Sequence, residues 1–336
     1  MQQKTNQRIV YLDLLRLIAT FAVILLHVAA SEVSYFSFSR NWYIATISDS
    51  LVRWSVPVFV MISGALFLNP CKEVTYKSLL TKYIPRLFLA YVFWSVVYCL
   101  LDKPSEFGIL YLMQSHFHLW FLPMLMGVFL LIPMLRTITQ DNKLFRYAIL
   151  IWIIYVCVSF CQFLSVFKSM THFYPLFNMN KVFGFSGYFL FGYFLSQRSL
   201  SKQQRILIYL IGLIGALITI FGTCYISMRK GVFNGRYFDN LSFQVMAMST
   251  AVFVFVKELV PKCEKTVTKL VGFVRKDLFG IYLTHALWLS AVNTKAFRHC
   301  CSEIITLPLI TIIVFLLSLF TTKLIRLIPG LRKVVE

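Results

Sequence analysis

The sequence predicts an all-α membrane protein, a bundle of about ten transmembrane helices with both termini in the cytoplasm. The first observation that indicates this class is that 59% of the 336 residues are hydrophobic and only 14% are charged. The second is the mean hydropathy of +0.74. Soluble domains are about one quarter charged, so a soluble globular enzyme is excluded. The third observation is a series of apolar segments close to the roughly 20 residues that a helix needs to cross a bilayer.

The apolar segments follow one another along the whole chain. The ten predicted spans are 9–30, 50–69, 85–101, 118–136, 146–166, 184–197, 205–225, 241–260, 278–293 and 304–325. The third, sixth and ninth are short, which fits tilted helices, broken helices or spans whose true boundaries lie further out. The stretches 31–49, 102–117, 167–183 and 226–240 are expected to be external loops. No connection is long enough for a separate soluble domain, so residues 1–336 are expected to form a single integral-membrane domain.

The positive charge of the chain indicates its orientation. A net charge of +20 also fits nucleic-acid binding, but its distribution favours a topological role. With both termini taken as cytoplasmic, Lys and Arg are about twice as frequent in inner connections as in outer ones. No nucleic-acid partner is therefore expected. Lys4 and Arg8 before an apolar run resemble a signal peptide, but the charged side chains that follow inside the run predict an uncleaved first helix.

The first span carries ionisable residues that a bilayer disfavours. Asp13 and Arg16 are three residues apart and are expected to pair. Arg16 and His27 are eleven residues apart, which places them about 20° apart around a helix with about 16 Å of rise between them, and Thr20 lies on the same stripe. Such residues normally face the bundle interior and mark a functional path. The alternative is a structural ion pair and an interfacial histidine bonded to a carbonyl.

Other polar residues lie at the ends of later spans. Arg53 begins the second span, where it either snorkels as an interfacial anchor or lies level with His27. Tyr282 and His285 are three residues apart in the ninth span, where structural packing is an equal alternative to a functional role.

A histidine pair precedes the fourth span. His116 and His118 form a His-x-His pattern with no evident third ligand, so no metal site is predicted, and Trp120 fits an interfacial aromatic belt. The sequence contains no P-loop, G-x-G-x-x-G or H-E-x-x-H motif and no G-x-S-x-G motif. These absences argue against an ATP-driven pump, a zinc protease and a serine hydrolase.

Four motifs in order resemble the membrane acyltransferase-3 family. Arg16-x₁₀-His27 is similar to the motif of the family's first helix, and Arg53-x-Ser-Val-Pro-x-Phe-x-Met-Ile-Ser-Gly64 to its second. The last two are His118-Leu-Trp120 and Gly280-Ile-Tyr282-x-x-His285. The branch that the pattern resembles is the enterobacterial common antigen O-acetyltransferase type. One departure is Lys82-Tyr-Ile-Pro-Arg86, which stands where the family often has Arg-x-x-Arg.

The resemblance implies an enzyme of the bacterial cytoplasmic (inner) membrane that moves an acyl group from cytoplasmic acyl-CoA to a hydroxyl of an extracytoplasmic or lipid-linked cell-surface glycan. Acetyl-CoA is the expected donor substrate, succinyl is an alternative acyl group, and no metal or permanently bound cofactor is expected. His27 is the expected general base, because imidazole titrates near pH 7, although an acyl-His27 intermediate is a variant. Arg16 acts with His27 and, with Lys82 and Arg86, is expected to contact CoA.

Supporting or substrate-binding roles fall to a second group of side chains. They are Asp13, Arg53, His118, Trp120, Tyr282 and His285. The main alternative is a transporter or flippase for a lipid-linked sugar or small anion, which would use the same intramembrane charges. A non-catalytic membrane scaffold is a third hypothesis.

Overall fold

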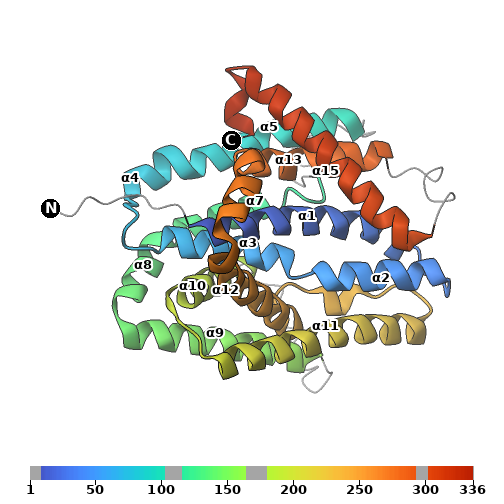
Figure 1. Ribbon diagram of the computed structural model, residues 1–336, viewed down its shortest axis with the longest axis horizontal. Coiled ribbons are helices and arrows are strands. Elements are labelled where there is room, and N and C mark those ends of the chain that lie inside the picture. The colour runs from blue at the N-terminus through green and yellow to red at the C-terminus, as the bar shows by residue number, and fades with distance from the viewer. Residues whose placement is uncertain (1–8, 103–115, 164–179, 293–301, 336) are drawn as a thin grey trace.

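The computed structural model describes residues 9–102, 116–163, 180–292 and 302–335, and every regular element in these ranges is a helix (Figure 1). In chain order they are α1 (Val10–Val33), α2 (Arg40–Val52), α3 (Ser55–Phe67), α4 (Tyr76–Ser78), the π-helical turn η1 (Leu79–Tyr83), α5 (Ile84–Asp102), α7 (Phe121–Leu130), α8 (Ile132–Gln140), α9 (Asn142–Phe163), α10 (Asn180–Gln197), α11 (Lys202–Lys230), the 3₁₀ turn η3 (Gly235–Phe238), α12 (Phe243–Val274), α13 (Leu278–Val292), α15 (Glu303–Leu327) and the 3₁₀ turn η4 (Leu331–Val334).

The helices confirm a multi-pass membrane protein. Within the described ranges, six helices or helix runs are long and apolar enough to cross a bilayer: Val10–Val33, Arg40–Phe67, Tyr76–Asp102, Lys202–Lys230, Gly235–Val274 and Glu303–Leu327. The pair α7 and α8, bent by 51°, would make a seventh. All ten predicted segments fall on helices, but α9, α10 and α13 lie outside this set. Ten spans and the cytoplasmic placement of the termini therefore remain predictions.

The expectation of an external loop over 31–49 is wrong, because α2 occupies most of it and joins α3 in one span. The indole of Trp42 is completely buried, and its Nε1 donates to the Val33 carbonyl at 3.1 Å. The polar side chains of Thr46 and Asp49 also point into the protein, since both are completely buried. Hydropathy alone misses this helix because half of its buried residues are polar.

Helix α1 lies in the middle of the bundle (Figure 1), where it packs against α2, α3, α12, α13 and α15. Helices α3 and α10 cross so closely that a side chain on Gly64 would meet the backbone of Phe189, and one on Gly192 would meet the backbone of Met61. Glycine at such crossings lets two membrane helices approach backbone to backbone. The crossing fixes the position of α3, which carries one wall of the site described below.

Candidate active site

The polar stripe of α1 faces the interior of the bundle. The guanidinium of Arg16 lies 3.6 Å from the Asp13 carboxylate. The hydroxyl of Thr20, only 1% exposed, donates to the Arg16 carbonyl at 2.8 Å. His27 follows at the far end of the same helix. The stripe thus runs along one helix through an otherwise apolar core, which is unfavourable unless polar partners or cavities accompany it.

Three histidine rings, those of His27, His285 and His118, form one cluster. The rings of His27 and His285 stack with centroids 5.4 Å apart and an angle of 23° between their planes. The ring of His118 meets His285 edge-on at 4.8 Å, and Phe117 packs against His27, also at 4.8 Å. The cluster therefore brings together three distant parts of the chain, namely α1, α13 and the turn that precedes α7.

The hydrogen bonds of α13 define the orientation of two of these groups. Nδ1 of His285 lies 2.5 Å from the Tyr282 carbonyl, and a carbonyl can only accept, so Nδ1 carries the proton. Nε2 of His285 is buried without a hydrogen-bond partner among the described residues. The Tyr282 hydroxyl donates to the carbonyl of His118 at 2.5 Å. These bonds tie the His118 turn to α13.

His116 joins the cluster, although only the His-x-His pattern had marked it in the sequence. Its Nδ1 lies 3.0 Å from Nδ1 of His118, and its ring stacks on Tyr98 at 4.3 Å. Burial lowers the pKa of His116, which lies outside the spans, so the ring is neutral at pH 7 and one of the two Nδ1 atoms donates to the other. In the described part of the chain, no three His, Cys, Asp or Glu side chains are grouped so as to hold a metal ion.

Arg53 points into the protein and does not snorkel towards the interface. It forms an ion pair with Asp49 one turn earlier, and its guanidinium lies 3.8 Å from the ring centroid of Phe238. Its Nε is buried without a hydrogen-bond partner among the described residues, so one N–H donor remains for another molecule. Asp49 was missed by sequence reasoning. The available signal was the spacing of four residues between an acid and a base on one helix.

An outer cavity of about 140 Å³ lies at this end of the stripe. Its polar lining residues are His27, Arg53, His118, Trp120, Asn240 and Tyr282. Most of the residues that the sequence singled out for the extracellular end therefore share one cavity. Asn240, which precedes α12, had no motif to mark it.

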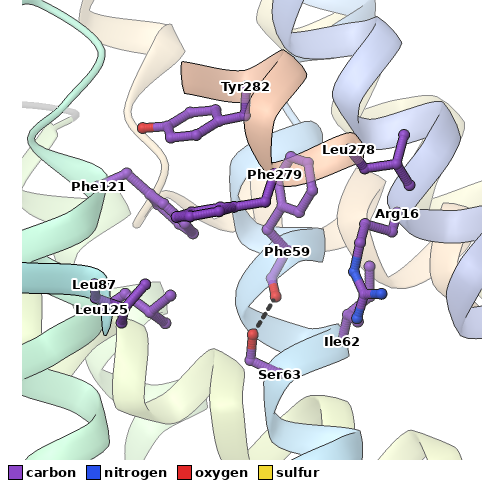
Figure 2. A pocket seen from close by; sticks show the side chains of 10 residues that line it. All are labelled: Arg16, Phe59, Ile62, Ser63, Leu87, Phe121, Leu125, Leu278, Phe279 and Tyr282. Carbon is purple, nitrogen blue, oxygen red and sulfur yellow. Dashed lines mark hydrogen bonds between the residues drawn. The ribbon is translucent and has the colours of Figure 1, made fainter. Parts of the chain in front are cut away.

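A middle cavity of about 150 Å³ adjoins the outer one, because Phe59, Phe121 and Tyr282 line both. Figure 2 shows the guanidinium of Arg16 on one side of this cavity and Phe121 on the other, with Tyr282 above them. The hydroxyl of Ser63, one of its few polar groups, donates to the Phe59 carbonyl at 3.0 Å. The middle cavity is therefore largely apolar.

The third cavity is an open basic mouth of about 600 Å³, and Arg16, Leu87 and Phe279 separate it from the middle cavity by lining both. Among the residues that the structure describes, six cationic side chains and no acidic one line this mouth: Arg16, Lys72, Arg86, Arg275, Lys276 and Arg332. Such a concentration of one sign of charge attracts anions.

Of the three cations expected to contact CoA, two line the basic mouth, namely Arg16 and Arg86. Lys82 is not among the lining residues, and its Nζ lies 5.6 Å from the ring centroid of Tyr83. Lys82 lies within the π-helical turn Leu79–Tyr83, whereas Arg86 lies beyond this turn in α5.

Lys72, in the loop between α3 and α4, is one of the cations that line the basic mouth. Its Nζ lies 3.4 Å from the ring centroid of Phe67. Arg136 holds the loop in place by donating to the carbonyls of Phe67 and Lys72, at 2.7 and 3.1 Å. Burial, together with the neighbouring cations Arg16, Lys82 and Arg136, lowers the pKa of Lys72 to about 8. From the sequence alone, Lys72 was only one of the cations that make up the inner excess of positive charge.

Comparisons with curated proteins and with solved structures found no match. One family model does match, that of an acyltransferase domain, and it covers residues 9–325. The match runs from the start of α1 almost to the end of α15. It therefore includes every residue named as lining the three cavities, apart from Arg332. The chain therefore belongs to the acyltransferase-3 family, and its three adjacent cavities lie in a membrane acyltransferase.

Proposed function

We propose that this protein is an O-acyltransferase, and by default an O-acetyltransferase, of the bacterial inner membrane. Its donor is cytoplasmic acyl-CoA, and its acceptor is a hydroxyl of an extracytoplasmic or lipid-linked cell-surface glycan. The observation that carries the proposal is a row of three adjacent cavities, with six cations lining the one at one end and His27 lining the one at the other. The likeness of the motif order to the enterobacterial common antigen O-acetyltransferase branch supports acetyl and a glycan acceptor.

The dimensions and chemistry of the cavities suit acyl-CoA. Its nucleotide end carries phosphates, which guanidinium groups bind with paired, charge-assisted hydrogen bonds. Its pantetheine arm is long, thin and mostly uncharged, as the middle cavity requires. The rise of about 16 Å from Arg16 to His27 along α1 is comparable with the reach of that arm. The thioester would then lie beside His27 while the phosphates stay in the basic mouth.

The outer cavity holds the groups that acyl transfer to a hydroxyl needs. His27 takes the proton of the glycan hydroxyl as its oxygen attacks the thioester carbonyl carbon. The negative charge on the carbonyl oxygen is stabilised by the free Nε–H of Arg53. The C–S bond then breaks, the acyl group remains on the glycan oxygen, and the CoA sulfur takes the proton from His27. Donor and acceptor are both consumed in one balanced step.

The orientation follows from the same arrangement. Lys72, Arg86 and Arg275 lie in inner connections if both termini are cytoplasmic, which agrees with the excess of positive charge on that side. The basic mouth then opens to the compartment that contains acyl-CoA, and the outer cavity to the compartment that contains the glycan.

The proposal is tested with purified protein in lipid nanodiscs. Release of the CoA thiol from acetyl-CoA is measured with and without a membrane-derived glycan acceptor, for the wild type and for His27→Ala. We expect acceptor-dependent thiol release by the wild type and almost none by the variant. A transporter or flippase would move a sugar lipid without consuming acetyl-CoA, so glycan movement with no thiol release would contradict the enzyme.

A further inference from the structure

The end of the chain folds back into the membrane bundle. Residues 328–335, here called the C-terminal strap, leave α15 and lie against α5, close to α13 (Figure 1). The indole Nε1 of Trp94, on α5, donates to the Val334 carbonyl at 3.0 Å. Val334 and Val335 are 3% and 0% exposed, in a cluster with Ala90 and Leu283. The strap is therefore a packed part of the fold.

An ion pair fixes the origin of the strap relative to the basic mouth. Arg326, near the end of α15, pairs with Asp277, whose side chain is 2% exposed. Asp277 directly follows Arg275 and Lys276, which line the mouth. The ion pair thus holds the start of the strap next to the turn between α12 and α13, which carries these two cations.

The strap carries one charged side chain into the mouth. Arg332, in the 3₁₀ turn η4, lines the same cavity as Arg16, Lys72 and Arg86. Its neighbour Lys333 has the same charge but is not among the lining residues. Position in the fold, and not charge alone, therefore distinguishes the two.

We propose that Arg332 is a phosphate-binding residue of the donor site, held there by the anchor between Trp94 and Val334. The inference rests on the proposed function, because it takes the phosphates to be those of acyl-CoA. An arginine at an open mouth can bind either the pyrophosphate or the ribose 3′-phosphate in the same way, through paired N–H donors. Arg332 lies beyond residue 325, where the match to the acyltransferase family ends. The donor site of this chain therefore includes a residue outside the matched domain.

The test is the affinity of the full-length protein in nanodiscs for CoA, measured by calorimetry at low salt. Arg332→Gln is expected to weaken CoA binding roughly tenfold or more, as for loss of a hydrogen bond to a charged group. Lys333→Gln, the matched control, is expected to bind like the wild type. Trp94→Phe keeps an aromatic ring but loses the N–H that holds the strap, and we expect it to weaken CoA binding by a smaller factor.

One CoA analogue distinguishes the two phosphates, and a second tests whether Arg332→Gln acts on anything besides nucleotide binding. If Arg332 binds the ribose 3′-phosphate, the difference between the wild type and Arg332→Gln vanishes with 3′-dephospho-CoA; if it binds the pyrophosphate, the difference persists. Turnover of S-acetyl-pantetheine, which has no nucleotide, should be equal for both proteins.

Each contrary result has its own meaning. CoA binding by Arg332→Gln at wild-type strength, or an equal loss in Lys333→Gln, would overturn the role of Arg332 and leave the proposed function intact. An effect of Arg332→Gln on S-acetyl-pantetheine turnover would show that the strap acts on the fold and would also overturn it. Absence of CoA binding by the wild type would overturn the proposed function itself.

Discussion

The imidazole of His285 lies nearly parallel to that of His27, with ring centroids 5.4 Å apart. His285 is completely buried and its Nδ1 is bonded to the Tyr282 carbonyl, so it cannot turn without breaking that bond. His27, by contrast, lines the outer cavity. The pair therefore consists of a fixed ring and a ring that can reach a substrate.

His27→Ala is expected to lower kcat by about 10²–10⁴-fold, the usual contribution of a general base. Expression and thermal stability should stay near those of the wild type, because His27 is only partly buried. Ser31→Ala, one turn further along α1, is the matched control: its hydroxyl donates to the Val28 carbonyl and does not line the outer cavity. Acetylation by His27→Ala at the control rate would remove His27 from the mechanism.

His285 is expected to act as a positioning residue. His285→Phe keeps a flat ring against His27, whereas His285→Ala removes it. If the ring positions His27, the alanine variant loses up to about 10²-fold in kcat and the phenylalanine variant loses much less, while KM for acetyl-CoA stays unchanged in both. Equal losses in the two variants would instead point to a requirement for the His285 nitrogens.

Lys72 is expected to make donor binding depend on pH. Its pKa of about 8 means that the ammonium group is present below pH 8 and is lost as the pH rises through 8. Bound phosphates favour the charged form, so KM for acetyl-CoA should rise above pH 8, by about tenfold per pH unit at most for a single proton. Lys72→Gln should raise KM at pH 7 and flatten this profile.

The control for Lys72 is Lys77→Gln, since Lys77 is exposed and does not line the basic mouth. Its KM should follow the wild-type profile. If Lys72→Gln retains the wild-type rise above pH 8, another group is responsible for it.

The sequence predicted the outer end of the site better than the inner end. His27, His118 and Tyr282 occur in spaced motifs, and the helix periodicity of the first span correctly placed Arg16 and Asp13 side by side. The outer cavity gathers such motif residues from several helices, so local patterns were enough to name them, although not to show that they meet.

The basic mouth could not be predicted in the same way. Lys72, Arg275 and Arg332 are far apart in the sequence and belong to no motif, so each looked like one more cytoplasmic cation. Only the tertiary fold, with α3, the α12–α13 turn and the strap side by side, brings them together. Lys82 was expected to contact CoA together with Arg86, but it lies in the π-helical turn η1 and is not among the residues that line the basic mouth.

Asp49→Asn is expected to destabilise the protein strongly. The carboxylate is completely buried and pairs with Arg53, and removing one partner of a buried ion pair typically costs about 3–5 kcal/mol. Glu258→Gln is the matched control, because the pair of Glu258 with Arg205 is far more accessible and such pairs contribute only about 0–1 kcal/mol. Unfolding in detergent, followed by denaturant titration, should separate the two variants. Equal losses in both would mean that the Asp49–Arg53 pair contributes no more than an exposed one.

Gly64 lies in the second of the family-like motifs, but its neighbours indicate packing and not chemistry. A methyl group there would meet the carbonyl oxygen of Phe189, and a backbone atom cannot rotate away as a side chain can. Gly64→Ala is therefore expected to push α3 and α10 apart and to cost about 1–3 kcal/mol of unfolding free energy. Because α3 also carries Phe59 and Ser63 of the middle cavity, transfer activity should fall with stability.

Gly272→Ala is the matched control for this crossing. Gly272 is also helical, in α12, but nothing lies within 4 Å of an added methyl group. Alanine there should be neutral or stabilise the helix by about 0.5–1 kcal/mol. Thermal melting of both variants in detergent tests this prediction. If Gly64→Ala melts at or above the midpoint temperature of Gly272→Ala, α3 and α10 have room for a side chain at their crossing. The glycine in this motif would then be required for a reason other than the close approach of the two helices.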